Sequence, residues 1–336
     1  MNKIIIDHSD KTPKVQQIIN SIKAEIDRGS LKRGDKILSV ADFAKTHQVA
    51  RDTVEKAYRR LKDEGYLETV AGKGNYITGN TGGELRILLI FNKLSSYKKE
   101  IYYSFLRVMG PKAKVDLQIH HYDPAILKEI IAHNKGKYHY YVVMPHFFQD
   151  SPEPDYQEIF HGIDPQSIMM LDKKPEVKGI EYPAVYQDFR LDIYEALYLA
   201  RHLFEKYRGI TVVFPQLNHH PVEILDGISS FCSESSITFS KATDMTELML
   251  KKGEAYITLT ESSLADLLKK IRLSGYVAGK DIGVLSFNET VMKELLDITV
   301  VTSEFTEMGS RAAQMILDKN FIQVRNQFRL IVRQSL

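Results

Sequence analysis

Residues 49–78 read VARDTVEKAYRRLKDEGYLETVAGKGNYIT, and this stretch decides the fold of the N-terminal part of the chain. Its first half carries apolar residues at helical spacing and stops at Gly65, which predicts a helix. Its second half predicts a β-hairpin, because two short β-prone runs flank the turn at residues 71–74. A helix followed directly by a hairpin is typical of the last helix and the wing of a winged helix.

Two further helices are predicted upstream of this stretch. Apolar side chains recur at helical spacing between Pro13, a residue common in first helical turns, and Gly29, a common helix terminator. A second, shorter helix begins at Ser39, whose hydroxyl makes a good N-cap. Three helices followed by a hairpin predict a winged helix-turn-helix.

The rest of the chain alternates strand-like and helix-like segments. Residues 85–91, LRILLIF, are almost continuously apolar, as expected of a strand that is buried on both faces of a parallel sheet. Further strands are predicted at 115–122, 139–145, 167–172, 210–215, 237–240, 255–260 and 282–287, and helices at 101–109, 124–134, 191–206, 224–234, 245–252 and 263–275. This pattern predicts an α/β fold with doubly wound parallel sheets in two lobes.

The composition changes at the polar stretch Gly-Asn-Thr-Gly-Gly over residues 79–83, which has no apolar side chain and is typical of a linker. We therefore expect one unit over 1–79, a linker over 80–84 and a second unit over 85–336. Residues 1–80 carry 15 Lys and Arg against 11 Asp and Glu, whereas the remainder carries 30 against 32. The excess of positive charge lies in the small N-terminal unit. Such an excess favours a polyanionic partner.

The composition and the lack of long apolar segments also indicate the cell compartment. Of the 336 residues, 43% are apolar and 26% charged, which is ordinary globular composition. The single cysteine, Cys232, excludes a disulfide framework and a cysteine-based zinc site. The N-terminus lacks the apolar core of a signal peptide, and no run approaches the length of a membrane span. We expect a cytoplasmic protein without a membrane segment.

The predicted third helix and the wing carry the side chains suited to DNA. The exposed residues at the start of this helix are Arg51, Asp52, Thr53 and Lys56. In a helix-turn-helix these positions face the base edges of the major groove, where the planar fork of an arginine pairs with guanine or with phosphate oxygens. At the wing tip, Lys73 lies between Gly72 and Gly74, on a loop that can reach the minor groove or the adjacent phosphates. The pattern predicts double-stranded DNA as a partner.

Residues 12–78 resemble the winged-helix domain of the GntR transcription regulators. The landmarks are Gly29-x-Leu31-x-x-Gly34-Asp35, Ser39, Val49-x-Arg51-x-Thr53-Val54, Leu61-x-x-x-Gly65 and the Gly72-x-Gly74 wing. The resemblance implies that Ser39, Arg51 and Thr53 contact DNA and that the wing glycines frame a minor-groove contact.

Two positions depart from the family pattern. Where the family usually has Pro-Ser-x-Arg at the second helix, this chain has Leu-Ser-Val-Ala, so Ala41 replaces an arginine that normally binds DNA. Ala50 stands where a serine usually precedes the recognition arginine, which removes one hydroxyl donor to phosphate. Alanine lacks the donors through which the family makes contacts at these two positions.

Residues 85–336 resemble the two-lobed sugar-binding domain shared by lac-repressor-type regulators and periplasmic binding proteins. The supporting residues are 274–276, 279–289, Val301-Thr302 and Met308-Gly309-x-x-Ala312. A GntR head on such a body is known among bacterial sugar-utilisation repressors, including arabinose and fucose regulators. The resemblance implies a homodimeric repressor of a carbohydrate-utilisation operon, with an effector-binding and dimerisation domain that binds a monosaccharide or a derivative between its lobes.

Ligands of open parallel sheets bind beyond the carboxyl ends of the strands, and polar residues follow the predicted strands here. The candidate effector contacts are Asn92, Lys93, His146, Asp172, Asp188, Gln216, Glu223, Glu261 and Asn288. By resemblance, Asn288 stands where the family has a ligand-binding aspartate. The family's usual arginine is Ile224 here, so Glu223 or His219 could take its place. For each residue alone, capping or solvating a loop is as good an interpretation as ligand contact.

An enzyme acting on a sugar or nucleotide is the alternative function. Against it, the first strand of the second unit is not followed by Gly-x-Gly-x-x-Gly, and the chain contains no nucleophile elbow or paired acid/base motif. Adjacent histidines at 120–121 and 219–220 cannot chelate a metal together, because neighbouring strand residues point to opposite faces. We expect no enzymatic activity, no cofactor and no metal.

Overall fold

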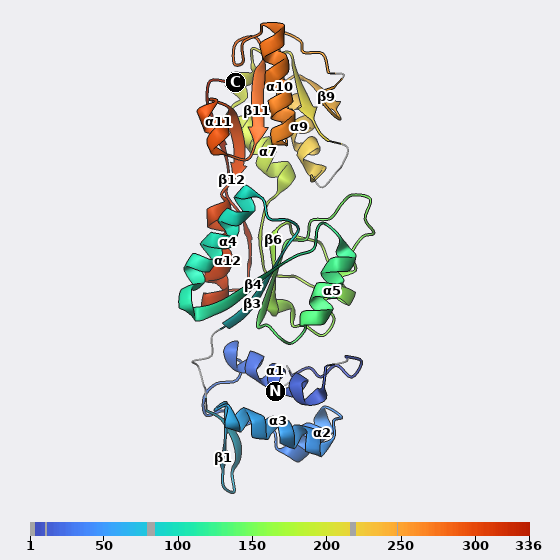
Figure 1. Cartoon of the computed structure of the whole chain (residues 1–336), viewed down its shortest axis with the longest axis vertical. Coiled ribbons are helices and arrows are strands. Elements are labelled where there is room, and N and C mark those ends of the chain that lie inside the picture. The colour runs from blue at the N-terminus through green and yellow to red at the C-terminus, as the bar shows by residue number, and fades with distance from the viewer. Residues whose placement is uncertain (1–3, 11, 79–84, 216–219, 247) are drawn as a thin grey trace.

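The computed structural model describes residues 4–10, 12–78, 85–215, 220–246 and 248–336. Figure 1 shows three bodies along the long axis: the N-terminal helices and hairpin at one end, then two α/β lobes. We call residues 4–78 the head, the α/β body next to it lobe 1, and the far body lobe 2. The predicted linker over 80–84 lies outside the described residues.

The head contains the three helices and the hairpin that the sequence predicts. Its elements are α1 (Lys14–Asp27), α2 (Val40–Thr46), α3 (Arg51–Asp63), β1 (Leu67–Val70) and β2 (Gly74–Ile77). Ile18, Ile22, Val54, Leu61 and Ile77 are fully buried and hold the helices and the hairpin around one core. The winged helix-turn-helix prediction is confirmed.

Lobe 1 is a parallel sheet with the strand order β13-β7-β6-β5-β3-β4. Its strands are β3 (Leu85–Phe91), β4 (Ala113–Ile119), β5 (Tyr140–Val143), β6 (Ile168–Asp172), β7 (Ala184–Tyr186) and β13 (Gln323–Arg325), and its helical segments are α4 (Ser96–Met109), η1 (Gly110–Lys112), α5 (Pro124–Asn134), α6 (Tyr156–Ile159), η2 (Pro165–Ser167) and α12 (Phe305–Asp318). Helices α4 and α12 lie side by side on one flank of the lobe, and α5 lies on the opposite flank (Figure 1). Helices therefore cover both faces of the sheet.

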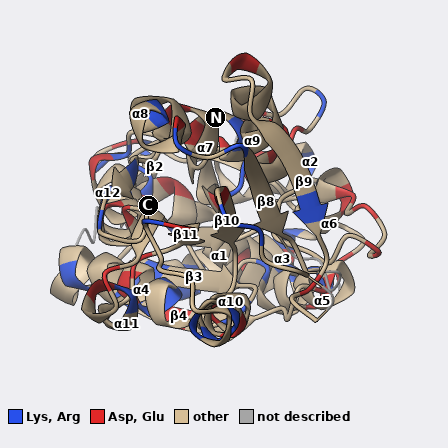
Figure 2. Cartoon of the chain, turned by 90° about the horizontal axis from the view of Figure 1, so that it is seen from above, with Lys and Arg blue, Asp and Glu red and all other residues tan. Residues whose placement is uncertain are grey.

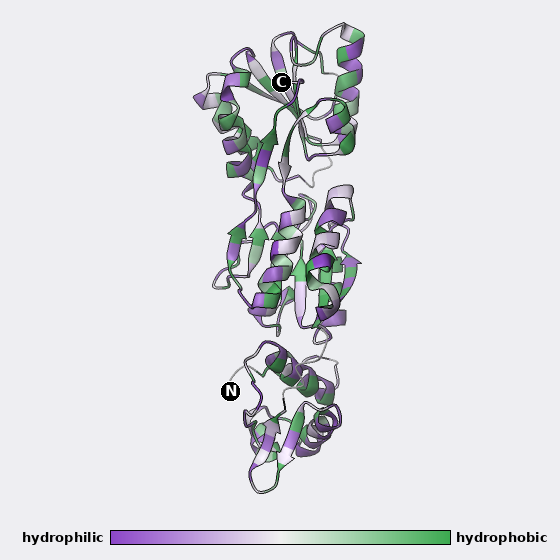
Figure 3. Cartoon of the chain, turned by 90° about the vertical axis from the view of Figure 1, so that its left-hand side faces the viewer, coloured by the Kyte–Doolittle hydropathy of each residue, from purple (hydrophilic) through white to green (hydrophobic). Residues whose placement is uncertain are grey.

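Lobe 2 repeats this arrangement with the strand order β14-β12-β11-β10-β8-β9, in which β14 alone is antiparallel to its neighbour. Its elements are α7 (Phe189–Leu199), α8 (Arg201–Phe204), β8 (Gly209–Val213), α9 (Glu223–Glu234), β9 (Thr238–Ala242), β10 (Glu254–Thr258), α10 (Glu261–Ser274), β11 (Gly283–Phe287), α11 (Val291–Leu295), β12 (Thr299–Ser303) and β14 (Phe328–Ile331). Central strands are apolar and outer helix faces polar (Figure 3). The predicted α/β fold with two parallel-sheet lobes is confirmed.

The chain passes between the lobes after β7, after β12 and after β13, so each lobe contains segments from distant parts of the sequence. Sequence analysis assigned no element to residues 299–331, where β12, α12, β13 and β14 lie. The helix predicted over 191–206 is divided at Ala200 into α7 and α8.

The helix predicted over 245–252 is wrong for the residues described there, which exclude 247. The residues described between β9 and β10, 243–246 and 248–253, contain no helical structure. Met245 is buried, and Leu248 and Leu250 pack against the core of lobe 2. Their apolar spacing reflects this packing of an irregular segment, which ends at Gly253 with a φ of +82°.

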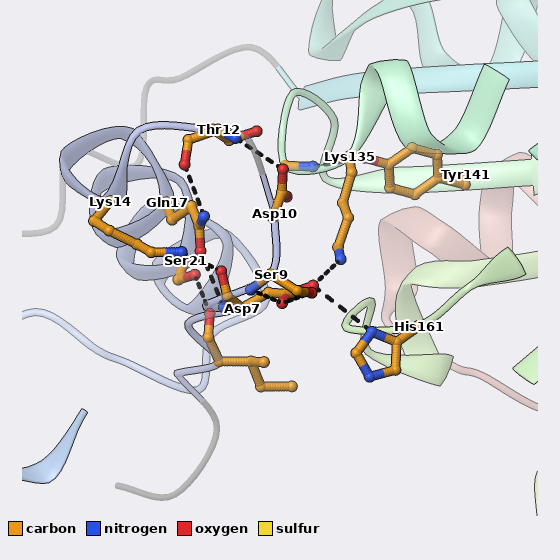
Figure 4. A network of polar contacts seen from close by, with 12 residues as sticks. Asp7, Ser9, Asp10, Thr12, Lys14, Gln17, Ser21, Lys135, Tyr141 and His161 are labelled. Atoms are coloured by element: carbon orange, nitrogen blue, oxygen red, sulfur yellow. Dashed lines mark hydrogen bonds and ion pairs between the residues drawn. The ribbon is translucent and has the colours of Figure 1, made fainter. Parts of the chain in front are cut away.

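Ion pairs hold the head against lobe 1. Figure 4 shows the carboxylate of Asp7 between Lys135 and His161 of lobe 1, and Lys135 Nζ lies 2.7 Å from Asp7 Oδ2. The bond from Lys135 holds the pKa of Asp7 well below its usual range. Asp27, the last residue of α1, pairs with His139 Nε2 at 2.6 Å. The α1 side of the head is therefore joined to lobe 1, while α3 and the wing face away from it (Figure 1).

Close packing of α4 against α12 depends on Gly309. A Cβ atom at this position would lie 2.2 Å from the backbone oxygen of Ile101 and 2.2 Å from Ser104 Oγ. We expect Gly309→Ala to destabilise the protein by roughly 1–3 kcal/mol, because overpacking must push the two helices apart. Urea unfolding followed by circular dichroism measures the loss. Gln314→Ala, at an exposed position of the same helix, is the control, and equal stability of the two variants would contradict this account.

Candidate functional site

Helix α3 presents a polar face to solvent and buries the opposite face in the head. Arg51, Asp52 and Lys56 are exposed and Thr53 is half-buried, whereas Val54 is fully buried. The buried face fixes the direction of the helix, and so the polar residues at its start are directed outward together. This is the arrangement that insertion into a DNA groove requires.

The wing carries a lysine on a turn that only glycine allows without strain. Gly72 has a φ of +71° and Gly74 a φ of +117°, and both values lie in the region that favours glycine. Lys73 between them is exposed. Lys36 was not among the predicted DNA contacts. Its backbone pairs with Tyr76, and its Cε would lie 3.0 Å from a Cβ on Gly74. A second lysine therefore lies beside the wing.

Ser39 has a structural role in addition to the one implied by resemblance. Its Oγ accepts a hydrogen bond from the backbone N–H of Asp42 at 3.1 Å and donates one to Asp42 Oδ2 at 2.6 Å. It is therefore the N-cap of α2, as predicted. Its contact with DNA stays a prediction.

A cavity lies between the two lobes at the carboxyl ends of their parallel strands. Asn92 directly follows β3, Asp172 is the last residue of β6, and Asn288 directly follows β11. The predicted effector contacts that line the cavity are Asn92, Lys93, His146, Asp172 and Asn288. Apolar side chains, among them Phe189, Ile224, Leu259, Phe287, Phe305 and Phe328, complete the lining. This mixture of apolar walls and a few polar groups is typical of a small-molecule site.

Backbone strain is concentrated at this cavity. Tyr122, Asp172 and Asn288 have φ values of 64°, 70° and 64°, and all three residues line it. Residues other than glycine rarely adopt such values, and they persist where the surrounding structure enforces them, often at functional sites. With these φ values, the three side chains point in directions that the side chains of an extended strand do not take.

Asp172 is the centre of a buried polar network. Its Oδ2 lies 2.9 Å from His146 Nε2 and 3.8 Å from Lys98 Nζ, and its Oδ1 accepts a hydrogen bond from Gln187. Burial alone would raise the pKa of Asp172, but His146, Lys98 and Gln187 outweigh burial and hold it well below its usual range. Ser303, the last residue of β12, donates to Gln187 Oε1. The network therefore joins lobe 1 to lobe 2.

Lys98 and Gln187 are members of this network that the list of candidate effector contacts missed. Lys98 is fully buried on α4, donates a hydrogen bond to Asn92 Oδ1, and has a pKa lowered to about 8 by burial. Its sequence signal is its spacing from Ile101 and Phe105, which places a charged residue on the buried face of the helix. A lysine there needs partners, which the strand ends supply.

The other candidate contacts have different positions. Asp188 and Glu261 lie outside the cavity lining, and Glu223 also lies outside it. Asp188 Oδ1 accepts a hydrogen bond from Leu191 N and caps α7. Gln216 and His219 lie outside the described residues. A role in effector binding stays a prediction for all of these residues.

The head of this chain is similar to known regulatory proteins. Residues 14–77 match the family model described as bacterial regulatory proteins, gntR family. The chain is 34% identical over 134 residues to the HTH-type transcriptional repressor YtrA of Bacillus subtilis, covering 40% of this chain and 95% of that protein. The chain belongs to the GntR family. It is a transcriptional regulator, and the predicted family of the head is confirmed.

Solved structures match the lobes in fold. The Escherichia coli transcriptional repressor ascG has a TM-score of 0.61 at 16% identity, covering 76% of this chain and 99% of that one. The transcriptional regulator CelR in complex with cellobiose has a TM-score of 0.59 at 15% identity, covering 89% of this chain and 95% of that one. At these identities the likeness shows the fold of this GntR-family regulator.

The described residues contain neither a candidate membrane span nor a candidate metal cluster. None of their helices is long and apolar enough to cross a bilayer. Among these same residues, no three His, Cys, Asp or Glu side chains are grouped so that they could hold a metal ion. Basic and acidic residues are mixed over the ribbons seen from the lobe 2 end of this regulator (Figure 2).

Arg51 is the first residue of α3 and is exposed. We expect Arg51→Ala to weaken operator binding by about 1–3 kcal/mol, because a bidentate contact to a base or phosphate is lost. The measurement is a gel shift with an operator fragment selected from genomic DNA by the wild-type protein.

Arg60→Ala is the matched control for this variant. Arg60 lies on the same helix but pairs with Glu64, with its Nε 3.3 Å from the carboxylate. Both variants remove one positive charge from α3, so a loss confined to Arg51→Ala identifies a direct contact. Wild-type affinity of Arg51→Ala would refute the role.

Proposed function

We propose that this protein is a repressor of a carbohydrate-utilisation operon whose DNA binding is controlled by a small sugar held between the lobes. The observation that carries the proposal is the buried network around Asp172 at the carboxyl ends of the strands. Amides, carboxylates and a lysine surrounded by aromatic walls match a sugar, which offers adjacent hydroxyls and apolar ring faces. The cellobiose complex of CelR, a protein of the same fold, supports this choice of ligand class.

Control requires that the sugar bind one arrangement of the lobes better than another, because a ligand shifts an equilibrium only by its differential affinity. The cavity lining comes from both lobes, so a sugar that contacts both stabilises a closed arrangement. Movement of lobe 1 reaches the head through the pairs at Asp7 and Asp27. The proposal thus connects the cavity to the orientation of α3.

We infer that the regulator acts as a homodimer that presents two heads to an operator with two half-sites. Helix α11 and the residue that follows it support this inference, because Val291, Met292, Leu295 and Leu296 are 79%, 60%, 74% and 50% exposed. Such a group of exposed apolar side chains is costly in water and suits an interface. In this proposal residues 1–79 are the DNA-binding domain, 80–84 the linker and 85–336 the effector-binding and dimerisation domain of a cytoplasmic, non-enzymatic protein.

A buried lysine with a lowered pKa is also found in enzymes that use the amine as a nucleophile, and Lys98 is the residue that the enzyme alternative would need. Its Nζ is bound by Asn92 Oδ1 and lies 3.8 Å from the Asp172 carboxylate. An ammonium held in this way is a hydrogen-bond donor rather than a nucleophile. The binding function therefore accounts for Lys98 better than catalysis does.

Thermal unfolding in the presence of single sugars tests the proposal. A bound sugar raises the melting temperature by mass action, and the panel comprises D-ribose, L-arabinose, D-xylose, D-glucose and D-galactose. We expect at least one of these sugars to stabilise the wild-type protein and to change its affinity for operator DNA. A panel without effect on either property would refute the sugar-responsive function.

Asn288→Ala should abolish this sugar response and leave DNA binding intact, because the amide lines the cavity far from the head. Alanine is strained at a φ of 64°, which costs about 1–2 kcal/mol. Asp297→Ala controls for that strain, because Asp297 has a φ of 54° and is exposed. An unchanged sugar response in Asn288→Ala would remove this residue from the site.

A further inference from the structure

The cavity contains a second buried carboxylate that the sequence analysis did not single out. Asp192 lies on α7 of lobe 2, is 3% exposed, and lines the cavity. Its Oδ2 has no hydrogen-bond partner among the described residues. A buried carboxylate oxygen without a donor is costly, so an unpaired oxygen in a cavity indicates a position where a ligand supplies the donor.

The other oxygen of Asp192 is fully engaged. Arg325 of β13 in lobe 1 places its Nε 2.7 Å and its Nη2 2.6 Å from Asp192 Oδ1. The same Nη2 lies 2.6 Å from Glu195 Oε2, so the guanidinium binds two carboxylates of α7. This arrangement holds Asp192 in place across the lobe boundary and leaves only Oδ2 available.

The charges around the cavity favour an uncharged ligand. Lys93 and Lys98 contribute two positive charges to the lining, and Asp172 and Asp192 contribute two carboxylates. A phosphate or carboxylate group on the ligand would be repelled by an unpaired Asp192 oxygen, whereas a hydroxyl would donate to it. Burial raises the pKa of Asp192 to about 6, against the effect of Arg325, which agrees with a carboxylate that lacks a full set of donors.

We propose that Asp192 is an effector contact of lobe 2 in addition to Asn288, accepting a hydrogen bond at Oδ2 from a hydroxyl group of an uncharged, unphosphorylated sugar. This inference rests on the proposed function. Asp172 anchors the lobe 1 side of the cavity, and Asp192 supplies the corresponding acceptor on the lobe 2 side. A sugar bound to both carboxylates bridges the lobes, and Arg325 connects its lobe 2 contact back to lobe 1.

Isothermal titration calorimetry on three full-length variants tests the contact with the panel sugar that stabilises the wild-type protein. We expect Asp192→Ala to bind this sugar roughly 10- to 100-fold more weakly, because a hydrogen bond to a charged acceptor is lost. Arg325 keeps Glu195 as a partner in this variant, so no buried charge is left unpaired. Asp192→Asn, which keeps the shape of the side chain, should show a smaller loss and serves if the alanine variant does not fold.

Glu195→Gln is the matched control, because it removes the other carboxylate of the same guanidinium without reaching the cavity. We expect this variant to bind the sugar as the wild-type protein does. Glucose 6-phosphate and glucuronate should not stabilise the wild-type protein, since both carry a negative charge.

Each outcome of these measurements decides a different point. Wild-type affinity in Asp192→Ala overturns the contact, and equal losses in Asp192→Ala and Glu195→Gln assign the effect to Arg325 and overturn it as well. Preferential binding of glucose 6-phosphate or glucuronate overturns the preference for an uncharged ligand. A wild-type protein that binds no sugar of the panel overturns the proposed function itself, which distinguishes that failure from the others.

Discussion

The buried carboxylate of Asp172 sets a constraint on which the rest of the inter-lobe cavity depends. A carboxylate removed from water is stable only if charges and hydrogen-bond donors replace the lost hydration. Here His146, Lys98 and Gln187 do so, and Lys98 in turn binds Asn92. Because these partners come from α4 and from the segments that follow β3, β5 and β7, satisfying one charge fixes the relative positions of several segments. In the proposed function, the same network supplies donors and acceptors for the sugar.

The path of the chain explains why one cavity can influence both lobes. Strands β7, β12 and β13 each end at the boundary, and the segments that follow them cross it. Hydrogen bonds and ion pairs are concentrated at these crossings, such as Ser303 to Gln187 and Arg325 to Asp192. The lobes are thus joined by polar contacts, which can exchange partners, rather than by a continuous apolar core, which is harder to rearrange. Such contacts suit the movement of the lobes that the proposed function requires.

Local sequence patterns predicted most of the architecture. The apolar spacing of α3 and the glycines of the wing identified the winged helix, since helix periodicity and positive φ values are properties of short segments. The apolar runs at 85–91 and 282–287 predicted buried parallel strands for the same reason. The helix predicted over 245–252 was wrong because the apolar residues of this segment pack against the core of lobe 2 without forming a helix. Residues 299–331 were left without assigned elements, although β12, α12, β13 and β14 lie there.

By itself, the sequence determined the fold class of both parts, the DNA-reading character of the head, and five of the polar residues that line the cavity. Only the tertiary structure decided that Lys98 and Asp192 belong to that cavity, that Arg325 pairs with a helix of the other lobe, and that Asp7 joins the head to lobe 1. The physical reason is distance along the chain. Helices, strands and turns depend on neighbours a few residues away, whereas a buried charge finds its partners only after distant segments have packed together.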